Sequence, residues 1–239
     1  MKKILLFIVV LLPFLGIGQS QLVRWNGSNG TSYSNAPSLL VSNVNASNAT
    51  GTNTFTNVQN YFRGVNYTTT NAPNNAQYME FAISANTGYD IALSNFSFTH
   101  DRSLNGARTF IVRYSTNGTT WTNIGSAVTV NTTDTAASID LSGLSVLSGT
   151  TFYVRVHPYN ALSTVGNNDY FYIRHGANSA TDNLDTVGPR FSGTVNCNQG
   201  DPSVYGANTW IGYVYDWVSG PETIENPIPN NYLGFVTEA

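Results

Sequence analysis

The sequence feature that most constrains the fold is residues 109–125, TFIVRYSTNGTTWTNIG. In its first half, apolar and polar residues alternate with the period of two that places successive side chains on opposite faces of a strand. The dipeptide Asn117-Gly118 follows and favours a type I′ turn, which needs positive φ at both central residues. An apolar pattern resumes at Trp121, which is expected to pack, and at Ile124. The segment therefore predicts a β-hairpin that fixes the pairing of two strands.

Segments with the same strand character recur through the chain, and no helical periodicity separates them. They are residues 78–83, 89–100, 127–130, 136–141, 152–156, 170–173 and 191–195. Short strands at this spacing predict an all-β fold, an antiparallel β-sandwich of the jelly-roll type. Inside 89–100 the apolar residues change parity between Leu93 and Phe96, which predicts a bulge or a switch between sheets.

Residues 1–18 have the layout of a secretory signal peptide. Two lysines precede an apolar run, residues 4–17, which ends in the small-x-small sequence Gly-Ile-Gly. The alternative is an uncleaved membrane anchor. At about fourteen residues the run is shorter than the roughly 20 that span a bilayer, and Pro13 interrupts it. We therefore expect export from the cell and no membrane span after cleavage of the signal.

The composition changes near the end of the chain and suggests a domain boundary there. We expect residues 19–195 to form the β-sandwich domain and residues 196–207 to form a linker. Residues 208–239 are then either the start of a second, truncated β domain or an edge addition to the first. Cys197 is the one cysteine of the sequence, and an odd cysteine in an exported protein implies a missing partner or a free thiol.

The charge composition excludes two classes of partner. Lys2 and Lys3 leave with the signal peptide, so ten basic residues less these two give eight arginines, against 13 acidic residues. Eight dispersed arginines cannot assemble the basic patch that nucleic acid requires. They also provide no polybasic segment for an anionic membrane surface.

Three segments resemble one known family of β-sandwich domains. YSTNGTTWTNIG, residues 114–125, resembles the Tyr-Ser-x-(Asp/Asn)-Gly-x-x-(Trp/Phe) segment of galactose-binding-like jelly rolls, which include discoidin-type domains. With FYVRVHPYNA (152–161) and GPRFSGTV (188–195), it is similar to the sandwich modules of bacterial surface proteins exported by the type IX secretion route. The resemblance covers roughly residues 20–195 and implies a secreted module that acts outside the cell or on its surface.

The end of the chain resembles a second family. GDPSVYGANTWIGYVYDW (200–217) and NYLGFVTEA (231–239) are similar to the start of aromatic-rich, lectin-like domains of the protective-antigen type. The sequence lacks the later strands and the acidic loop that would carry sugar or calcium in that family, and it lacks the C-terminal sorting domain of type IX cargo. Both differences are expected of a fragment of a longer exported protein.

Arginine and aromatic side chains suggest a ligand-binding face. The candidates are three arginines near the ends of predicted strands and three residues that share their faces: Arg113, Arg155, Arg174, Tyr153, His157 and Tyr172. Within each strand they have the parity opposite to the apolar residues, so they would face away from the core. If the strands are neighbours, rings that stack on sugar faces and guanidinium groups that bind hydroxyls or carboxylates would form a platform for a sugar or an acidic glycan. The alternative is a solvated sheet face with cross-strand packing of tyrosine on arginine.

No catalytic constellation is recognisable in the sequence. His100-Asp101-Arg102 could supply an acid/base pair, but an Asp-Arg pair commonly closes a turn, and no serine or cysteine nucleophile lies in a recognisable elbow. We therefore expect a turn at these residues. Glycoside hydrolysis needs two facing carboxylates, and Glu80 is the one glutamate in residues 19–221. We therefore expect no enzymatic activity.

Clustered oxygen ligands raise the question of a metal. Asn167, Asn168 and Asp169 could hold a structural calcium ion, but Asx residues also form turns without an ion. The three histidines are far apart in the sequence, which gives zinc no support. No cofactor is expected.

Together these patterns predict a secreted, non-catalytic β-sandwich module whose function is cell-surface adhesion or glycan binding. The alternative is a structural spacer or accessory domain of a larger exported protein, such as an extracellular glycoside-active enzyme. The partners would then be an extracellular glycan or neighbouring domains of the same protein.

Overall fold

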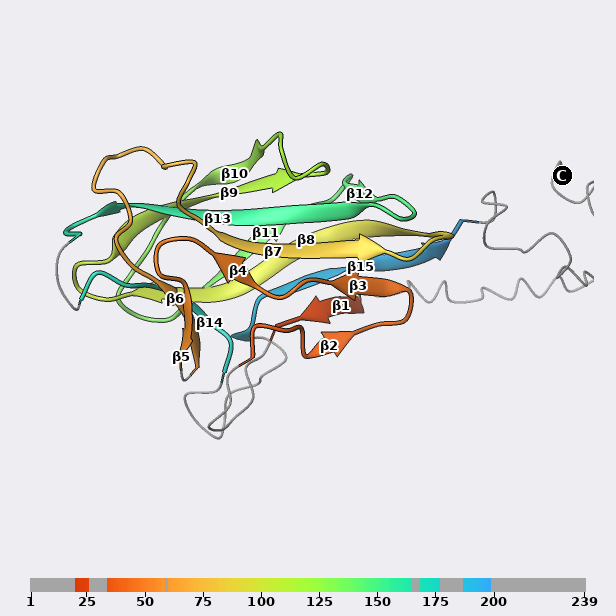
Figure 1. Cartoon of the computed structure of the whole chain (residues 1–239), viewed down its shortest axis with the longest axis horizontal. Helices are drawn as coiled ribbons and strands as arrows, with labels where there is room; N and C mark the ends of the chain where they lie inside the picture. Colours follow the sequence, from red (N-terminus) through yellow and green to blue (C-terminus); the bar gives the residue numbers. More distant parts are fainter. Residues whose placement is uncertain (1–19, 26–33, 59, 165–167, 177–186, 199–239) are drawn as a thin grey trace, which may run out of the picture.

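A computed structural model describes residues 20–25, 34–58, 60–164, 168–176 and 187–198 of the chain. Within these ranges the strands are β1 (Ser20–Arg24), β2 (Leu39–Leu40), β3 (Val44–Ala46), β4 (Thr50–Gly51), β5 (Thr56–Val58), β6 (Tyr61–Gly64), β7 (Met79–Ala85), β8 (Tyr89–Arg102), β9 (Ala107–Ser115), β10 (Thr122–Thr129), β11 (Thr135–Asp140), β12 (Ser145–Val146), β13 (Thr151–Ala161), β14 (Phe171–Arg174) and β15 (Arg190–Cys197). Figure 1 shows the long strands running along the longest axis of the molecule. Among the described residues, no helix is long and apolar enough to cross a membrane.

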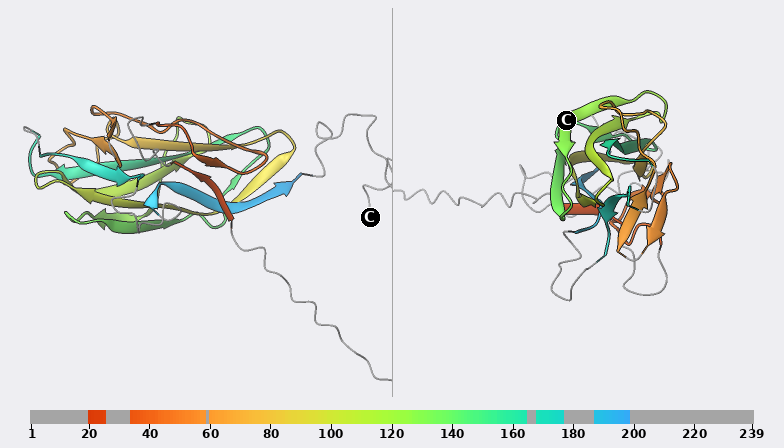
Figure 2. Two further views of the ribbon diagram at one scale, coloured as in Figure 1. Left: turned by 90° about the horizontal axis from the view of Figure 1, so that it is seen from below. Right: turned by 90° about the vertical axis from the view of Figure 1, so that its left-hand side faces the viewer.

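The strands form two antiparallel sheets. One, the β10–β3 sheet, has the order β10-β9-β13-β7-β3, with β4 also paired to β7. The other, the β8 sheet, has the order β2-β1-β15-β8-β14-β6-β5. Outside this order, β11 and β12 also pair with β8. Successive strands β7, β8 and β9 alternate between the sheets, and so do β12, β13 and β14, so that the chain winds around both layers (Figures 1 and 2). The prediction of an antiparallel β-sandwich is confirmed.

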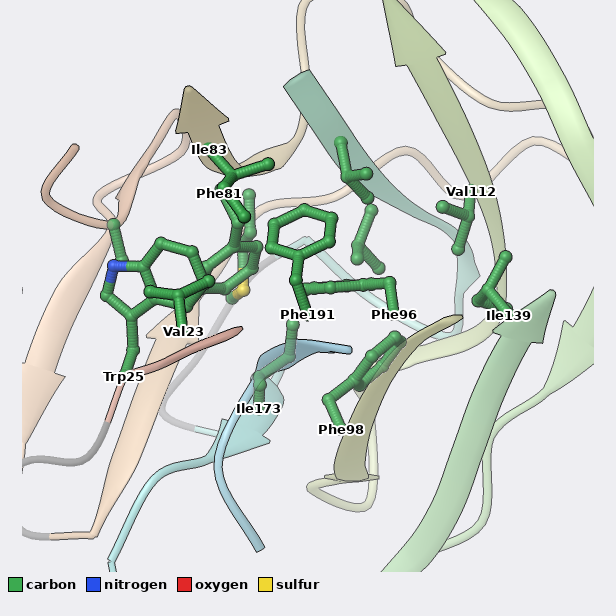
Figure 3. Packing of buried hydrophobic residues seen from close by; sticks show 14 of the residues in the cluster. Val23, Trp25, Phe81, Ile83, Phe96, Phe98, Val112, Ile139, Ile173 and Phe191 are labelled. Atoms are coloured by element: carbon green, nitrogen blue, oxygen red, sulfur yellow. The ribbon is translucent and has the colours of Figure 1, made fainter. Parts of the chain in front are cut away.

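Aromatic residues fill the space between the sheets (Figure 3). The Trp25 ring lies 5.2 Å from that of Phe81 and 6.0 Å from that of Phe191, in edge-to-face geometry. Its indole N–H donates to the carbonyl of Ser47 at 2.9 Å, so the one polar atom of the ring is satisfied in the core. Each fully buried ring contributes roughly 1.5–3 kcal/mol to folding. This apolar layer fixes which face of every strand points inward.

The parity change in β8 is a bulge, as predicted. Ile91 and Leu93 point into the core on one side of it, and Phe96 and Phe98 do so on the other. The register between β8 and β15 shifts where Leu93 pairs with Gly193, beside the Asn95–Ser192 pair. A Cβ at Gly193 would lie 2.2 Å from the carbonyl oxygen of Ala92, so only glycine allows the strands to approach this closely.

The predicted hairpin is present, because β9 pairs with β10, but the predicted type I′ turn is wrong. Gly118 has φ of 72°, whereas Asn117 is not among the residues with positive φ. The Asn117 Oδ1 atom accepts from the backbone N–H groups of Thr119 at 2.9 Å and Thr120 at 2.8 Å. Ser115 Oγ accepts from the N–H of Gly118 at 2.9 Å. These side-chain bonds support a wider loop, residues 116–121, in place of a two-residue turn.

The predicted domain boundaries lie mostly outside the described residues. This applies to the signal peptide (1–18), to residues 208–239 and to most of the linker. Within the described part, β15 continues to Cys197, two residues beyond the predicted end of the sandwich at Val195. The N–H of Asn198 then donates to the carbonyl of Gly88 at 2.9 Å, which holds the end of β15 against the start of β8.

Candidate functional site: a groove on the outer face of the β10–β3 sheet

A row of polar side chains crosses the outer face of the β10–β3 sheet. Asn123 of β10 is opposite Arg113 of β9, which is opposite Arg155 of β13, which is opposite Glu80 of β7. Each of these residues has the parity opposite to inward-facing neighbours such as Val112. Because the strands are in register, one residue from each of four strands meets the next along a line across the sheet.

Arg155 is the central residue of this row. The Cζ atom of its guanidinium lies 3.6 Å from the centroid of the Tyr78 ring and 3.8 Å from that of the Trp121 ring. Its Nε–H donates to Glu80 Oε2 at 2.6 Å. Cation–π contacts of this kind contribute roughly 0.5–2 kcal/mol each, depending on desolvation. The two rings and the carboxylate therefore hold the guanidinium in one orientation.

Arg113 is held by neutral groups. Its Nε–H donates to Asn123 Oδ1 at 2.8 Å, and its Nη1 donates to Asn75 Oδ1 in the segment before β7. In the described part of the chain, no carboxylate forms an ion pair with Arg113. Its positive charge is therefore positioned without being neutralised.

His157 follows Arg155 by two residues on the same face of β13, and only 2% of its surface is exposed. Its Nδ1 atom lies 3.0 Å from the carbonyl oxygen of Gln77 and 3.3 Å from that of Asn74. A carbonyl oxygen can only accept, so Nδ1 carries the proton and Nε2 is an acceptor in the neutral ring. Burial lowers the pKa of His157 to about 4, and the charges of Arg113 and Arg155 act in the same direction. Among the described residues, Nε2 has no hydrogen-bond partner.

These side chains line a groove with a volume of about 910 Å³. Residues 119–123, from the loop and the start of β10, line it together with Asn75, Arg113, Arg155 and His157; we name it the arginine groove. Its lining combines threonine hydroxyls, asparagine amides, two guanidinium groups, a tryptophan ring and a largely buried imidazole ring. None of these lining residues is acidic.

The structure brings together three of the side chains expected in the ligand-binding face, namely Arg113, Arg155 and His157. Tyr153 is beside the groove, with its ring 6.4 Å from that of Trp121. Tyr78 and Trp121, whose rings both contact the Arg155 guanidinium, were not candidates from the sequence, in which Trp121 was expected only to pack. Both lie just outside regular strands, where the parity of strand residues carries no information.

Tyr172 and Arg174 lie elsewhere, on β14 in the β8 sheet. Arg174 is buried, and its Nη1 donates to Asp134 Oδ2 at 2.6 Å. The Tyr172 ring is 5.1 Å from that of Tyr61 and 5.6 Å from that of Tyr170. The six candidates are therefore divided between two sheets. Parity shows whether a side chain points away from the core, but not which sheet carries its strand.

His100-Asp101-Arg102 continues β8, so the interpretation of these residues as a turn is wrong. His100 points into the core, where burial lowers its pKa to about 4 and neither ring nitrogen has a partner among the described residues. Asp101 is on the other face of the strand. Its burial raises its pKa to about 6, the charge of Asp134 adds to this, and Arg174 opposes it. Because His100 and Asp101 alternate across the sheet, they cannot act as an acid/base pair.

The residues considered for calcium make contacts within the protein. Asn167 lies outside the described residues. The carbonyl of Asn168 accepts from the N–H of Asn105 at 2.7 Å, and Asp169 Oδ2 accepts from the N–H of Asn66 at 3.2 Å. Within the described ranges, no group of three or more histidine, cysteine, aspartate or glutamate residues could hold a metal ion. A structural calcium ion at 167–169 stays a prediction.

Comparisons with known proteins find similarity in the solved structures. No family model matches the sequence, and no curated protein does. A mutant of a family 29 carbohydrate-binding module, solved in complex with mannohexaose, is 9% identical with a TM-score of 0.36, over 66% of this chain and 89% of that one. The C-terminal domain of a chitobiase from Bacteroides fragilis is 14% identical with a TM-score of 0.35, over 65% of this chain and 96% of that one. These identities and TM-scores are too low to assign a family or a ligand.

Proposed function

We propose that the arginine groove binds a saccharide and that the domain is a non-catalytic carbohydrate-binding module. The observation that carries this proposal is the Arg155 guanidinium, fixed between the Tyr78 and Trp121 rings at the edge of a groove lined with hydroxyl and amide groups. Saccharide sites combine an aromatic surface for the C–H faces of the sugar with rigid polar groups for its hydroxyls. Both elements occur together here.

The contacts within the groove favour binding because they order its side chains in advance. Arg155 is held by two rings and Glu80, and Arg113 is held by Asn75 and Asn123. A ligand that binds side chains already held in place loses less conformational entropy on association. The amides and the threonine hydroxyls can both donate and accept, as sugar hydroxyls do.

The predicted signal peptide indicates where the protein would carry out this function. A saccharide-binding module that is exported would act outside the cell or on its surface, in adhesion or as an accessory domain of a larger protein. A domain that serves only as a spacer would make contact with its neighbouring domains and would not bind a free polysaccharide. Binding by the isolated protein therefore separates the two functions.

The test is binding of the mature chain to a glycan array and to polysaccharides in affinity gels. We expect Trp121→Ala to weaken binding by about tenfold or more, because it removes an aromatic contact at the centre of the site. Tyr172→Ala is the control, since it removes a ring of the β8 sheet. Circular dichroism checks that both variants are folded. No binding to any polysaccharide, or unchanged binding by Trp121→Ala, would contradict the proposal.

A further inference from the structure

The two arginines of the groove form an unusual pair. Arg113 and Arg155 are directly opposite each other on adjacent antiparallel strands. Like charges in this position repel each other and destabilise the pair of strands. Glu80 on the neighbouring strand β7 forms an ion pair with Arg155 and offsets its charge, whereas the partners of Arg113 are two neutral amides. The chain as a whole carries a net charge of −3, so this positive charge is a local feature.

Both guanidinium groups retain unused donors. In the described part of the chain, Arg155 donates a hydrogen bond through Nε alone, and Arg113 donates through Nε and Nη1. The Nη atoms of Arg155 and the Nη2 atom of Arg113 therefore have no protein acceptor among those residues. A guanidinium group matches a carboxylate in geometry and charge, and it binds carboxylates with two parallel hydrogen bonds. An anion placed between the two arginines would also relieve their repulsion.

His157 is not a group that a ligand can reach. Only 2% of its surface is exposed, and its Nε2 atom is buried, with no hydrogen-bond partner among the described residues. The polar contacts open to a ligand therefore come from the two arginines and from the threonine hydroxyls and asparagine amides that line the groove.

We infer that the saccharide bound in the arginine groove is acidic, with a sugar carboxylate held by Arg113 and Arg155 and sugar hydroxyls bonded to the threonine and asparagine side chains of the groove. This inference rests on the proposed function, because it specifies the ligand of the same groove. Uronic acids carry both groups on one ring. The ligand class is therefore a polysaccharide that contains uronic acid.

The experiment compares acidic polysaccharides with neutral forms of the same chains. Polygalacturonate, alginate and hyaluronan are each titrated into the mature protein beside a form in which the carboxylates have been esterified or reduced. We expect at least one acidic polymer to bind about tenfold or more tightly than its neutral form, since a charge-assisted hydrogen-bonded pair is lost with the carboxylate. The difference should shrink in high salt, which screens exposed charges.

A pair of matched variants tests the role of Arg113. Arg113→Gln removes the charge and keeps an amide that can bond to Asn123, so the affinity for the acidic polymer should fall about tenfold while that for the neutral form stays unchanged. Arg63→Gln removes the same charge from an arginine on β6 of the β8 sheet, whose guanidinium lies over the Tyr170 ring, and should change neither affinity. This control separates a contact in the groove from a change in net charge.

The outcomes distinguish failure of the inference from failure of the proposed function. Equal binding of acidic and neutral forms, lost in Trp121→Ala, overturns the acidic ligand and leaves the saccharide site in place. Tighter binding of a sulfated galactan than of every carboxylated polymer overturns the uronate and retains an anionic site. Binding to none of these polymers and to nothing on the glycan array overturns both.

Discussion

Arg155 and Arg174 have similar sequence surroundings, in FYVRV and FYIRH, and each donates a 2.6 Å hydrogen bond to a carboxylate. Their positions in the fold are different. Arg155 lies on β13 in the β10–β3 sheet, between two rings and beside the arginine groove. Arg174 lies on β14 in the β8 sheet, and its side chain is 8% exposed, against 18% for Arg155.

The difference shows that an ion pair by itself does not mark a binding site. Arg174 is buried beside Asp134, and its charge also acts on Asp101. It compensates Asp101 of β8 and Asp134 just before β11, which is a structural role. Arg155 is paired with one carboxylate and keeps donors for a ligand. What distinguishes the two residues is which donors remain unused and whether they border a groove.

The largest expected effect concerns pH. His100, His157 and His175 each have a pKa lowered to about 4 by burial, against 6.5 in the unfolded chain. Between these values the unfolded state binds more protons, so stability is complete above pH 6.5 and falls as pH drops toward 4. Asp101, whose pKa is raised to about 6, acts in the opposite direction. We expect a net loss of roughly 3–5 kcal/mol between pH 7 and pH 5.

Urea unfolding at a series of pH values measures this loss. His157 lies in the β10–β3 sheet and His100 in the β8 sheet. Replacing one histidine at a time therefore assigns its share of the stability loss to one sheet. A free energy of unfolding that does not change between pH 7 and pH 5 would show that the histidines are not held in their neutral form.

The second prediction compares the two arginines directly. Arg174→Ala should lower the free energy of unfolding by about 2–4 kcal/mol, because Asp134 and Asp101 lose their common cation in a partly buried site. Arg155→Ala should cost about 1–2 kcal/mol, because the lost ring contacts are offset by the end of the repulsion with Arg113. Saccharide binding should be lost in Arg155→Ala and retained in Arg174→Ala. The reverse pattern of binding would place the ligand on the β8 sheet.

The third prediction compares two buried histidines. The His100 ring packs against Phe98, Phe110 and Phe171, and neither of its nitrogens has a partner among the described residues. His100→Phe should raise the free energy of unfolding by about 1 kcal/mol, because it removes unsatisfied polar atoms from an apolar site. His157→Phe should lower it by about 1–2 kcal/mol, because two backbone carbonyls lose their donor. Thermal unfolding at neutral pH checks both signs, and a loss of stability in His100→Phe would contradict the first.

The smallest expected effect is in the loop that carries Trp121. Asn117→Ala removes the acceptor of the Thr119 and Thr120 N–H groups and should cost about 0.5–1 kcal/mol. Because the loop places Trp121 over Arg155, affinity for the saccharide should also fall, by about threefold to tenfold. Gly118→Ala, which places a side chain at φ of 72°, should cost about 1 kcal/mol. Tryptophan fluorescence reports whether Trp121 has moved, and unchanged affinity in Asn117→Ala would show that the loop does not position the ring.

Much of the fold follows from local patterns in the sequence. The alternation in residues 109–115 predicted β9, and the parity change between Leu93 and Phe96 predicted the bulge in β8. The short strands β3, β4 and β5 were not predicted, because segments of two or three residues are too short to show a periodicity. The type I′ turn was predicted wrongly, because the side chains of Ser115 and Asn117 bond to the loop backbone and open it.

The arginine groove could be predicted only in part. Strand parity indicated that Arg113, Arg155 and His157 face outward, and their register across β9 and β13 brings the first two together. Parity could not show that Arg174 belongs to the other sheet. Strand parity also gave no information on Tyr78, which is placed by the start of β7, or on Trp121, which is placed by the loop before β10.

The sequence by itself determined the class of fold and the inward face of the longer strands, because the period of two in apolar residues is a local property of the backbone. The tertiary structure decided which strands are neighbours, and with that which outward side chains meet. The strand order depends on packing between two aromatic faces that are distant in the sequence. For this reason the sequence supplied the arginines of the groove, while the fold supplied the two rings around Arg155.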